Sequence, residues 1–203
     1  PLQATEEGRC EREMVPMTVG DETYMTDQGI RPGTSVETLA GLKPAFKEDG
    51  KITAGNASQV SDGAAAVMLM SREKADELGL KARARIVDTT TVGVDPVIML
   101  TGPIPATRKI LERNSMGIGD VDLVEINEAF ASVVLAWEKE LKPDMDRVNV
   151  NGGAIAIGHP LGSTGARLMT SLLHEMERDD KEMGLVTMCC GGGGGTATLI
   201  ERV

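Results

Sequence analysis

Three segments of the sequence combine polar side chains with glycines that would let a ligand approach the backbone. They are Asn127–Ala131, Asn149–Gly165 and Cys189–Gly195. The first supplies the amide of Asn127, the second the imidazole of His159 and the third the thiol of Cys189. Each segment lies at the end of a predicted strand, and open α/β sheets place their ligand sites at such ends. The sequence therefore predicts that these groups meet at one edge of a sheet.

Each of these side chains also has an ordinary structural interpretation. Asn127 could simply cap the helix that follows it, because Asn is a favoured N-cap residue. His159 lies in a loop of Gly and Pro, where a structural histidine is common. Cys189 could be a small buried hydrophobic residue. Position in the sequence alone leaves these interpretations open.

Two other kinds of site fit the same residues less well. A metal site built on His159, Cys189 and Cys190 lacks ligands, because adjacent cysteines rarely bind one tetrahedral ion and only Cys10 remains as a further thiol. A phosphate loop at Gly158–Gly165 lacks the Lys-Ser/Thr ending of a P-loop and the spacing of a dinucleotide site. We therefore expect no metal. The glycines fit close backbone approach to a ligand, or an anion held on N–H groups.

The elements that would position these groups alternate along the second half of the chain. We expect strands at 83–91, 121–126, 148–151, 184–190 and 196–202, and helices at 105–113, 128–141 and 163–177. This order predicts an α/β fold with a mixed five-stranded sheet and helices on its faces. The last two strands are joined by the run Gly191–Gly195, where positive φ angles are expected.

The first 80 residues have a different character. Residues 1–60 are rich in Gly, Thr, Asp, Glu and Pro, and we expect an irregular region with one or two short helices, one near 35–42. The apolar run 63–70 predicts a buried strand. A short helix at 72–78 should follow, capped by Ser71 and ended by Gly79. The strand precedes the self-contained unit, so we assign 61–80 to another domain and 81–203 to the main one.

Composition narrows the class of protein. The 203 residues carry a net charge of −10, which disfavours nucleic acid as a partner. No apolar run approaches the roughly 18 residues of a membrane span. The 3 cysteines form no plausible disulfide framework, so we expect a reducing compartment, the cytoplasm. The chain begins at Pro1 and enters a polar stretch at once, and we expect it to be a fragment of a longer protein.

The three segments, in this order, resemble the signatures of the thiolase family, in which an NEAFA helix start, a GHPxG loop and a C-x-GGG turn converge. Other stretches also resemble family segments: Thr53–Ser58, Ser61–Ala65, Val92–Pro96 and Gly102–Pro105. Decarboxylating condensing enzymes share the fold, but Asn127-Glu-Ala-Phe and Cys189-Cys-Gly-Gly-Gly are thiolase features. The resemblance implies the C-terminal half of an acetyl-CoA acetyltransferase or 3-ketoacyl-CoA thiolase, without the half that holds the nucleophilic cysteine. Residues 1–60 would then belong to its loop region for CoA and 61–80 to its N-terminal domain.

The resemblance also implies a reaction: thiol-dependent Claisen cleavage or condensation of 3-oxoacyl-CoA with CoA, through an acyl-enzyme. It implies that His159 helps form the nucleophilic thiolate and that Cys189 is the general acid and base at the acetyl α-carbon. Asn127 would position a water that, with His159, forms one oxyanion hole. The N–H of Gly191 would contribute to the other.

For CoA, the resemblance implies Ser58 near the pantetheine, Met99 and Phe130 as apolar walls, and Arg31 near the nucleotide end. Each of these four could equally be an ordinary core or surface residue. CoA is a substrate here, so we expect no cofactor.

The resemblance further implies a homodimer or homotetramer built through both halves of the protein. The alternative is a non-catalytic half-thiolase that binds acyl-CoA or supports oligomerisation. A family member that had lost its catalytic activity would not need to keep Asn127, His159 and Cys189, and all three are present.

Overall fold

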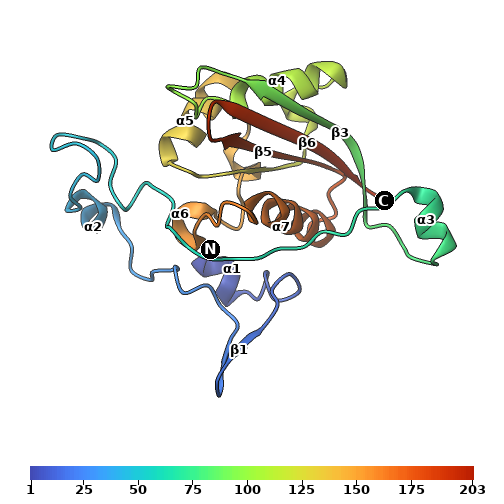
Figure 1. Cartoon of the computed structure of the whole chain (residues 1–203), viewed down its shortest axis with the longest axis horizontal. Helices are drawn as coiled ribbons and strands as arrows, with labels where there is room; N and C mark the ends of the chain where they lie inside the picture. Colours follow the sequence, from blue (N-terminus) through green and yellow to red (C-terminus); the bar gives the residue numbers. More distant parts are fainter.

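The structure is a computed structural model that describes residues 1–203, and its centre is a mixed four-stranded sheet (Figure 1). The strands in spatial order are β3 (Ala84–Gly93), β6 (Gly194–Arg202), β5 (Met183–Cys190) and β4 (Leu123–Ile126). β4 runs parallel to β5, whereas the other neighbours are antiparallel. The mixed sheet predicted from the sequence is therefore confirmed, including the hairpin formed by β5 and β6.

Helices cover both faces of this sheet (Figure 1). α4 (Pro103–Arg113) and α5 (Ala131–Leu141) pack on one face, and α7 (Thr164–Arg178) packs on the other. Alternate residues of β5 face the two sides, so that Leu185 meets the α4 and α5 layer and Val186 meets α7. Each fully buried aliphatic side chain contributes about 1.5–3 kcal/mol. Burial on both faces explains why these strands read as continuous apolar runs.

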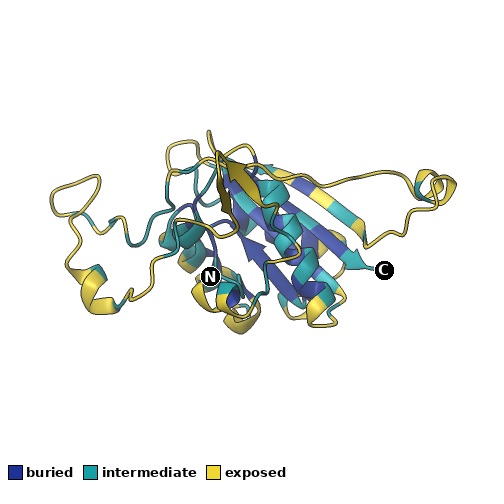
Figure 2. Ribbon diagram, turned by 90° about the horizontal axis from the view of Figure 1, so that it is seen from below, coloured by how far each residue is buried: buried dark blue, intermediate teal, exposed yellow.

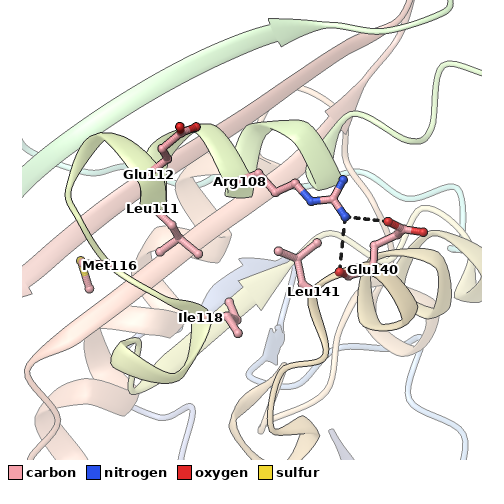
Figure 3. Close-up of a pocket in the computed structure, with 7 residues that line it drawn as sticks. All are labelled: Arg108, Leu111, Glu112, Met116, Ile118, Glu140 and Leu141. Atoms are coloured by element: carbon pink, nitrogen blue, oxygen red, sulfur yellow. Dashed lines mark hydrogen bonds and ion pairs between the residues drawn. The ribbon is translucent and has the colours of Figure 1, made fainter.

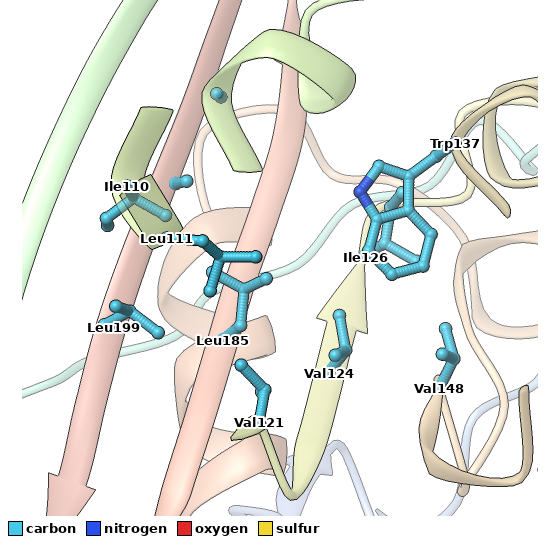
Figure 4. Packing of buried hydrophobic residues seen from close by; sticks show 11 residues of the cluster. Ile110, Leu111, Val121, Val124, Ile126, Trp137, Val148, Leu185 and Leu199 are labelled. Atoms are coloured by element: carbon cyan, nitrogen blue, oxygen red, sulfur yellow. The ribbon is translucent and has the colours of Figure 1, made fainter. Parts of the chain in front are cut away.

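The larger core cluster holds the only tryptophan (Figure 4). Trp137 is fully buried between the helices, and its indole N–H donates to the hydroxyl of Thr107 at 3.0 Å. This bond satisfies the polar atoms of both side chains. It also ties α5 to α4, and α5 follows directly on the segment that carries Asn127.

The helix predicted at 128–141 begins later, at Ala131. Phe130 is the N-cap residue, with extended angles of φ −144° and ψ 152°, and it forms a bridge with Ala57. This pairing keeps residues 128–130 out of the helix. Asn127 therefore does not cap the helix, and that structural interpretation is wrong.

The fifth strand, predicted at 148–151, is reduced to a single parallel bridge between Val148 and Val124. Asn149 has φ +46° and Gly152 has φ +83°, so the chain turns at once and cannot continue a ladder. A short helix that was not predicted follows, α6 (Ala154–Ile157). Two 3-10 turns, η1 (Ile118–Asp120) and η2 (Met145–Arg147), complete this half.

Short elements mark the first 80 residues: α1 (Leu2–Glu6), β1 (Met17–Val19), β2 (Glu22–Tyr24), α2 (Val36–Ala40) and α3 (Arg72–Glu77). The hairpin of β1 and β2 was not predicted. The helices α2 and α3 were, and the hydroxyls of Ser35 and Ser71 cap them by accepting from backbone N–H groups. Gly79 follows α3 with φ +66°, as expected for a helix end. None of the helices is long and apolar enough to cross a membrane.

Residues 63–70 were predicted to form a buried strand of a sheet outside the main domain, and within this chain they do not form it. The segment forms no strand and is exposed along its whole length (Figure 2). Met68 and Leu69 are 79% and 69% exposed. Apolar composition favours a strand only where a neighbouring strand supplies hydrogen bonds, and no strand of this chain pairs with the segment. The result is a stretch of exposed apolar side chains that leads into α3.

Candidate active site

Asn127 is the first residue after β4, at the carboxyl-terminal edge of the sheet. Its backbone N–H donates to the carbonyl of Thr187 at 3.0 Å, which continues the parallel pairing with β5 for one more residue. Its side chain is fully buried, and the Nδ2 atom lies 3.3 Å from Nε2 of His159. The structure therefore brings together two of the groups that the sequence singled out, 32 residues apart.

His159 is presented by the loop between α6 and α7. Gly158 has φ +92°, and a Cβ there would lie 2.0 Å from the Ser61 hydroxyl, so only glycine fits this turn. The backbone N–H of His159 donates to the carbonyl of Gln59 at 3.0 Å. Its Nδ1 lies 2.7 Å from the hydroxyl of Thr164. The imidazole is thus held by its backbone and at both ring nitrogens.

Burial lowers the pKa of His159, and the positive charge of Arg167 on α7 lowers it further. Both effects disfavour the imidazolium. At neutral pH the ring is consequently neutral and able to accept a proton from an acidic group.

Cys189 lies on β5 at the same edge of the sheet and pairs with Gly195 across the hairpin. It is 7% exposed and packs in a small cluster with Ala129 and Val133, against which Leu100 and Phe130 also pack. Ala129 is two residues after Asn127, so one short segment carries Asn127 and also packs against Cys189. The thiol itself forms no hydrogen bond with the imidazole in this chain. The structure brings Cys189 to the shared edge through packing.

Burial raises the pKa of the Cys189 thiol, and the neighbouring Cys190 raises it further, against a backbone hydrogen bond that lowers it. A buried thiol of raised pKa stays protonated at neutral pH. The edge therefore offers a neutral base at His159 and a protonated acid at Cys189, the two states that proton transfer in opposite directions requires.

The glycine run after Cys190 is partly turn and partly strand. Gly192 and Gly193 have φ of +77° and +89°, as predicted for the tight connection. Gly194 and Gly195 belong to β6, where the backbone of Gly102 comes so close that a Cβ on Gly195 would lie 2.3 Å from the Gly102 carbonyl oxygen. Gly191 is exposed at the start of the turn, directly beyond β5. Its position is set by the hairpin that also sets Cys189.

The four residues considered for CoA fall into two groups. The backbone N–H of Ser58 donates to the carbonyl of Ala129 at 3.0 Å, and Phe130 packs against the Cys189 cluster. Met99 is half-buried and precedes Leu100 of the same cluster. These three therefore lie around the edge that carries the polar groups. The Arg31 side chain is exposed and forms no hydrogen bond or ion pair with them.

Sequence reasoning missed three residues that shape this site. The Gln59 amide donates to the carbonyls of Gly29, Ile155 and Ala156, which fixes the loop before His159. The Glu128 carboxylate accepts from Asn149 Nδ2 at 3.0 Å and from the Ile155 N–H at 3.1 Å. Thr164 contacts the imidazole directly. Glu128 and Thr164 lie in two of the segments singled out in the sequence, although no role was predicted for either, whereas Gln59 carried no signal.

An open depression elsewhere on the surface is lined by Arg108, Leu111, Glu112, Met116, Ile118, Glu140 and Leu141 (Figure 3). Arg108 and Glu140 form an ion pair at 2.6 Å across it. Met116 and Ile118 precede β4, whereas the polar groups described above follow β4. The depression therefore lies toward the opposite edge of the sheet and shares no residue with them.

A mixed sheet with helices on both faces makes this an α/β protein. The amide, imidazole and thiol at one edge of the sheet are groups that can take part in acid–base chemistry. Comparison with protein-family models identifies the family. The thiolase C-terminal domain matches residues 80–202, and the thiolase N-terminal domain matches residues 2–73. The chain belongs to the thiolase family.

Curated relatives agree along nearly the whole chain. An acetyl-CoA acetyltransferase of Syntrophomonas wolfei is 51% identical over 207 residues, which cover 99% of this chain and 52% of that protein. A steroid 3-ketoacyl-CoA thiolase of Mycobacterium tuberculosis is 51% identical over 196 residues, which cover 97% of this chain and 48% of that protein. The chain thus spans about half the length of the curated relatives it matches.

Solved structures show the same fold. The Bacillus anthracis acetyl-CoA acetyltransferase superposes with a TM-score of 0.95 at 49% identity, over 100% of this chain and 52% of that one. The human mitochondrial 3-ketoacyl-CoA thiolase in complex with CoA gives a TM-score of 0.92 at 39% identity, over 100% of this chain and 51% of that one. The arrangement of sheet and helices described above is therefore that of the thiolase fold.

Proposed function

We propose that this chain is the acid–base half of a thiolase that cleaves or forms 3-oxoacyl-CoA with CoA. The observation that carries the proposal is the contact between Asn127 and His159 at the edge of the sheet that also carries Cys189. The nucleophilic cysteine would come from the part of the protein outside this chain. In cleavage it bonds to the 3-keto carbon, the bond between C2 and C3 breaks, and acetyl-CoA leaves. The thiol of free CoA then takes the acyl group from the enzyme.

His159 and Asn127 would act on the nucleophile and on the thioester oxygen. A neutral imidazole can take the proton of the nucleophilic thiol and then donate as an imidazolium to developing negative charge. The buried Oδ1 atom of Asn127 has no hydrogen-bond partner within the chain. The amide therefore has capacity left for a water beside the substrate, which supports its assignment to an oxyanion hole.

Cys189 and Gly191 would complete the machinery. In cleavage the protonated Cys189 thiol gives its proton to the carbanion at C2 of the departing acetyl group, and in condensation it takes that proton back. The raised pKa of this thiol supports the first of these roles. The exposed N–H of Gly191 would serve the second oxyanion hole together with the nucleophile's own N–H.

Binding of CoA would use Ser58, Met99 and Phe130 around the pantetheine, which their positions near Cys189 support. Arg31 is exposed and free to meet the nucleotide end. CoA enters as a substrate, so no cofactor is needed. We further infer a homodimer or homotetramer built through both halves, and a reducing compartment such as the cytoplasm, which the free thiols of Cys10, Cys189 and Cys190 favour.

The test is thiolysis of acetoacetyl-CoA by the full-length protein. Cys189→Ala should lower the production of acetyl-CoA by at least about 10²-fold, the contribution expected of a general acid–base group. Cys190→Ala is a matched control, because the adjacent side chain points to the other side of the strand. Acetyl-CoA production undiminished in Cys189→Ala would contradict the proposal and favour a binding role without catalysis.

A further inference from the structure

The imidazole of His159 is contacted at both of its ring nitrogens by side chains that are fully buried. Nε2 faces the Asn127 amide at 3.3 Å, and Nδ1 faces the Thr164 hydroxyl at 2.7 Å. Thr164 is the first residue of α7, so its backbone is fixed by a helix of 15 residues. The contact at Nδ1 is the shorter of the two, and the sequence predicted no role for Thr164.

The Thr164 hydroxyl already donates its one proton to another group. The Oγ1 atom donates to the carbonyl oxygen of Pro160 at 2.9 Å, and a carbonyl oxygen can only accept. A hydroxyl has one proton, so Oγ1 turns its lone pairs toward His159. It can therefore accept a hydrogen bond from Nδ1–H but has no second proton to donate to it.

The other ring nitrogen leads to the same assignment. Asn127 presents Nδ2, which donates only, to Nε2 of the imidazole. If Nε2 carried a proton, two hydrogen-bond donors would face each other and neither would have an acceptor in this contact. A proton on Nδ1 and a lone pair on Nε2 satisfies both contacts at once, and the hydrogen bond at one ring nitrogen determines the state of the other.

We propose that Thr164 is a positioning residue that holds neutral His159 in its Nδ1–H form, which leaves Nε2 unprotonated and able to act as the base. This inference rests on the proposed function. Thr164 touches neither the substrate nor the reacting atoms. Its oxygen orients the ring and, once Nε2 has taken the thiol's proton, keeps accepting from the Nδ1–H of the imidazolium.

The first experiment compares three variants of the full-length protein in the thiolysis of acetoacetyl-CoA. Thr164→Val keeps the shape of the side chain but removes the acceptor for Nδ1–H, and we expect kcat to fall about 10–100-fold, as for other residues that orient a functional histidine. Thr164→Ser restores the oxygen and should recover most of the activity. Ser163→Ala is the matched control, because its hydroxyl also donates to Pro160, at 3.3 Å, without touching the imidazole.

The pH profile separates positioning from a structural effect. The imidazolium loses an acceptor in Thr164→Val, so the acid limb of kcat/KM should move to lower pH, by about half a unit or more. Arg167 is the charged group that acts on the ring, and it is unchanged in all three variants. Equal rates and equal acid limbs in wild type and Thr164→Val would overturn the inference while leaving the proposed function intact. A wild-type protein without thiolysis would instead refute the proposed function.

A second measurement does not depend on activity. Nitrogen-15 NMR of the full-length protein with labelled histidine, assigned by the signal lost in His159→Gln, reports which ring nitrogen carries the proton above the acid limb. We expect the proton on Nδ1 in the wild type. A proton on Nε2 would refute the inference even if Thr164→Val fails to fold.

Discussion

The close crossing of two backbones beside Cys189 gives the sharpest structural prediction, for the substitution Gly195→Ala. Gly195 pairs with Cys189 in the hairpin, and its Cα faces the backbone of Gly102 at the start of α4. An added Cβ would lie 2.3 Å from the carbonyl oxygen and 2.4 Å from the carbonyl carbon of Gly102. Ordinary contact begins at 3.4 Å, so the two backbones must separate by about 1 Å.

This separation has two consequences of known size. Overpacking of a close contact costs about 1–3 kcal/mol of unfolding free energy. Displacement of a catalytic group by about 1 Å lowers the rate about 10²-fold. The displaced strand carries Gly195, which pairs with Cys189 across the hairpin. We therefore expect Gly195→Ala to lower both the urea midpoint of the full-length protein and its kcat/KM for thiolysis of acetoacetyl-CoA.

Gly93→Ala is the matched control. Gly93 lies on the neighbouring strand β3 and pairs with Gly194, but a Cβ there meets nothing within 4 Å. It should change stability by no more than the usual half kcal/mol or so for a surface substitution. If Gly195→Ala matched Gly93→Ala in both stability and rate, the close crossing would not hold Cys189 in place.

Three further predictions concern polar groups that are buried or half-buried. Burial raises the pKa of Glu125 to about 8, so unfolding releases its proton and stability should fall as pH rises from about 4.5 to 8, by at most about 1.4 kcal/mol per unit. Glu125→Gln should flatten that part of the stability curve in urea titrations at several pH values, and an unchanged slope would contradict the assignment. Glu128→Ala leaves the side-chain amide of Asn149 and the backbone N–H of Ile155, both on the segment that leads to His159, without this acceptor, and we expect a loss of about 1–3 kcal/mol together with a lower kcat, measured by urea unfolding and thiolysis. Trp137→Phe leaves the Thr107 hydroxyl buried without its partner, and calorimetry should show a destabilisation of about 1–3 kcal/mol with little change in KM.

The spacing of apolar residues and the types of residue at turns correctly predicted the helices and strands that pack against other parts of this chain. The strands β5 and β6 and the helices α4 and α7 were expected because their apolar residues face a sheet or helix that the chain itself supplies. Segment 63–70 has the same composition but lacks a neighbouring strand, so its local pattern was misleading. Local pattern indicates what a segment can form, whereas pairing depends on partners far away in the sequence.

The sequence singled out the residues of the candidate site, but not most of the residues that support them. Asn127, His159 and Cys189 stood out by residue type and position, and the structure places them at one edge. Gln59 and Glu128 stabilise the His159 loop through hydrogen bonds that join residues more than 20 positions apart. No local pattern predicts such bonds, because they depend on the folded positions of two loops.

The most direct test of the account is a crystal structure of the full-length protein with acetyl-CoA bound. It should place the thioester oxygen against His159 and a water on Asn127, and the acetyl methyl carbon within about 3.5 Å of the Cys189 sulfur, the separation of groups poised to react. A complex in which Ala129 and Phe130 stand between the acetyl group and that sulfur would contradict the assignment of Cys189 as the acid and base, and with it the proposed mechanism.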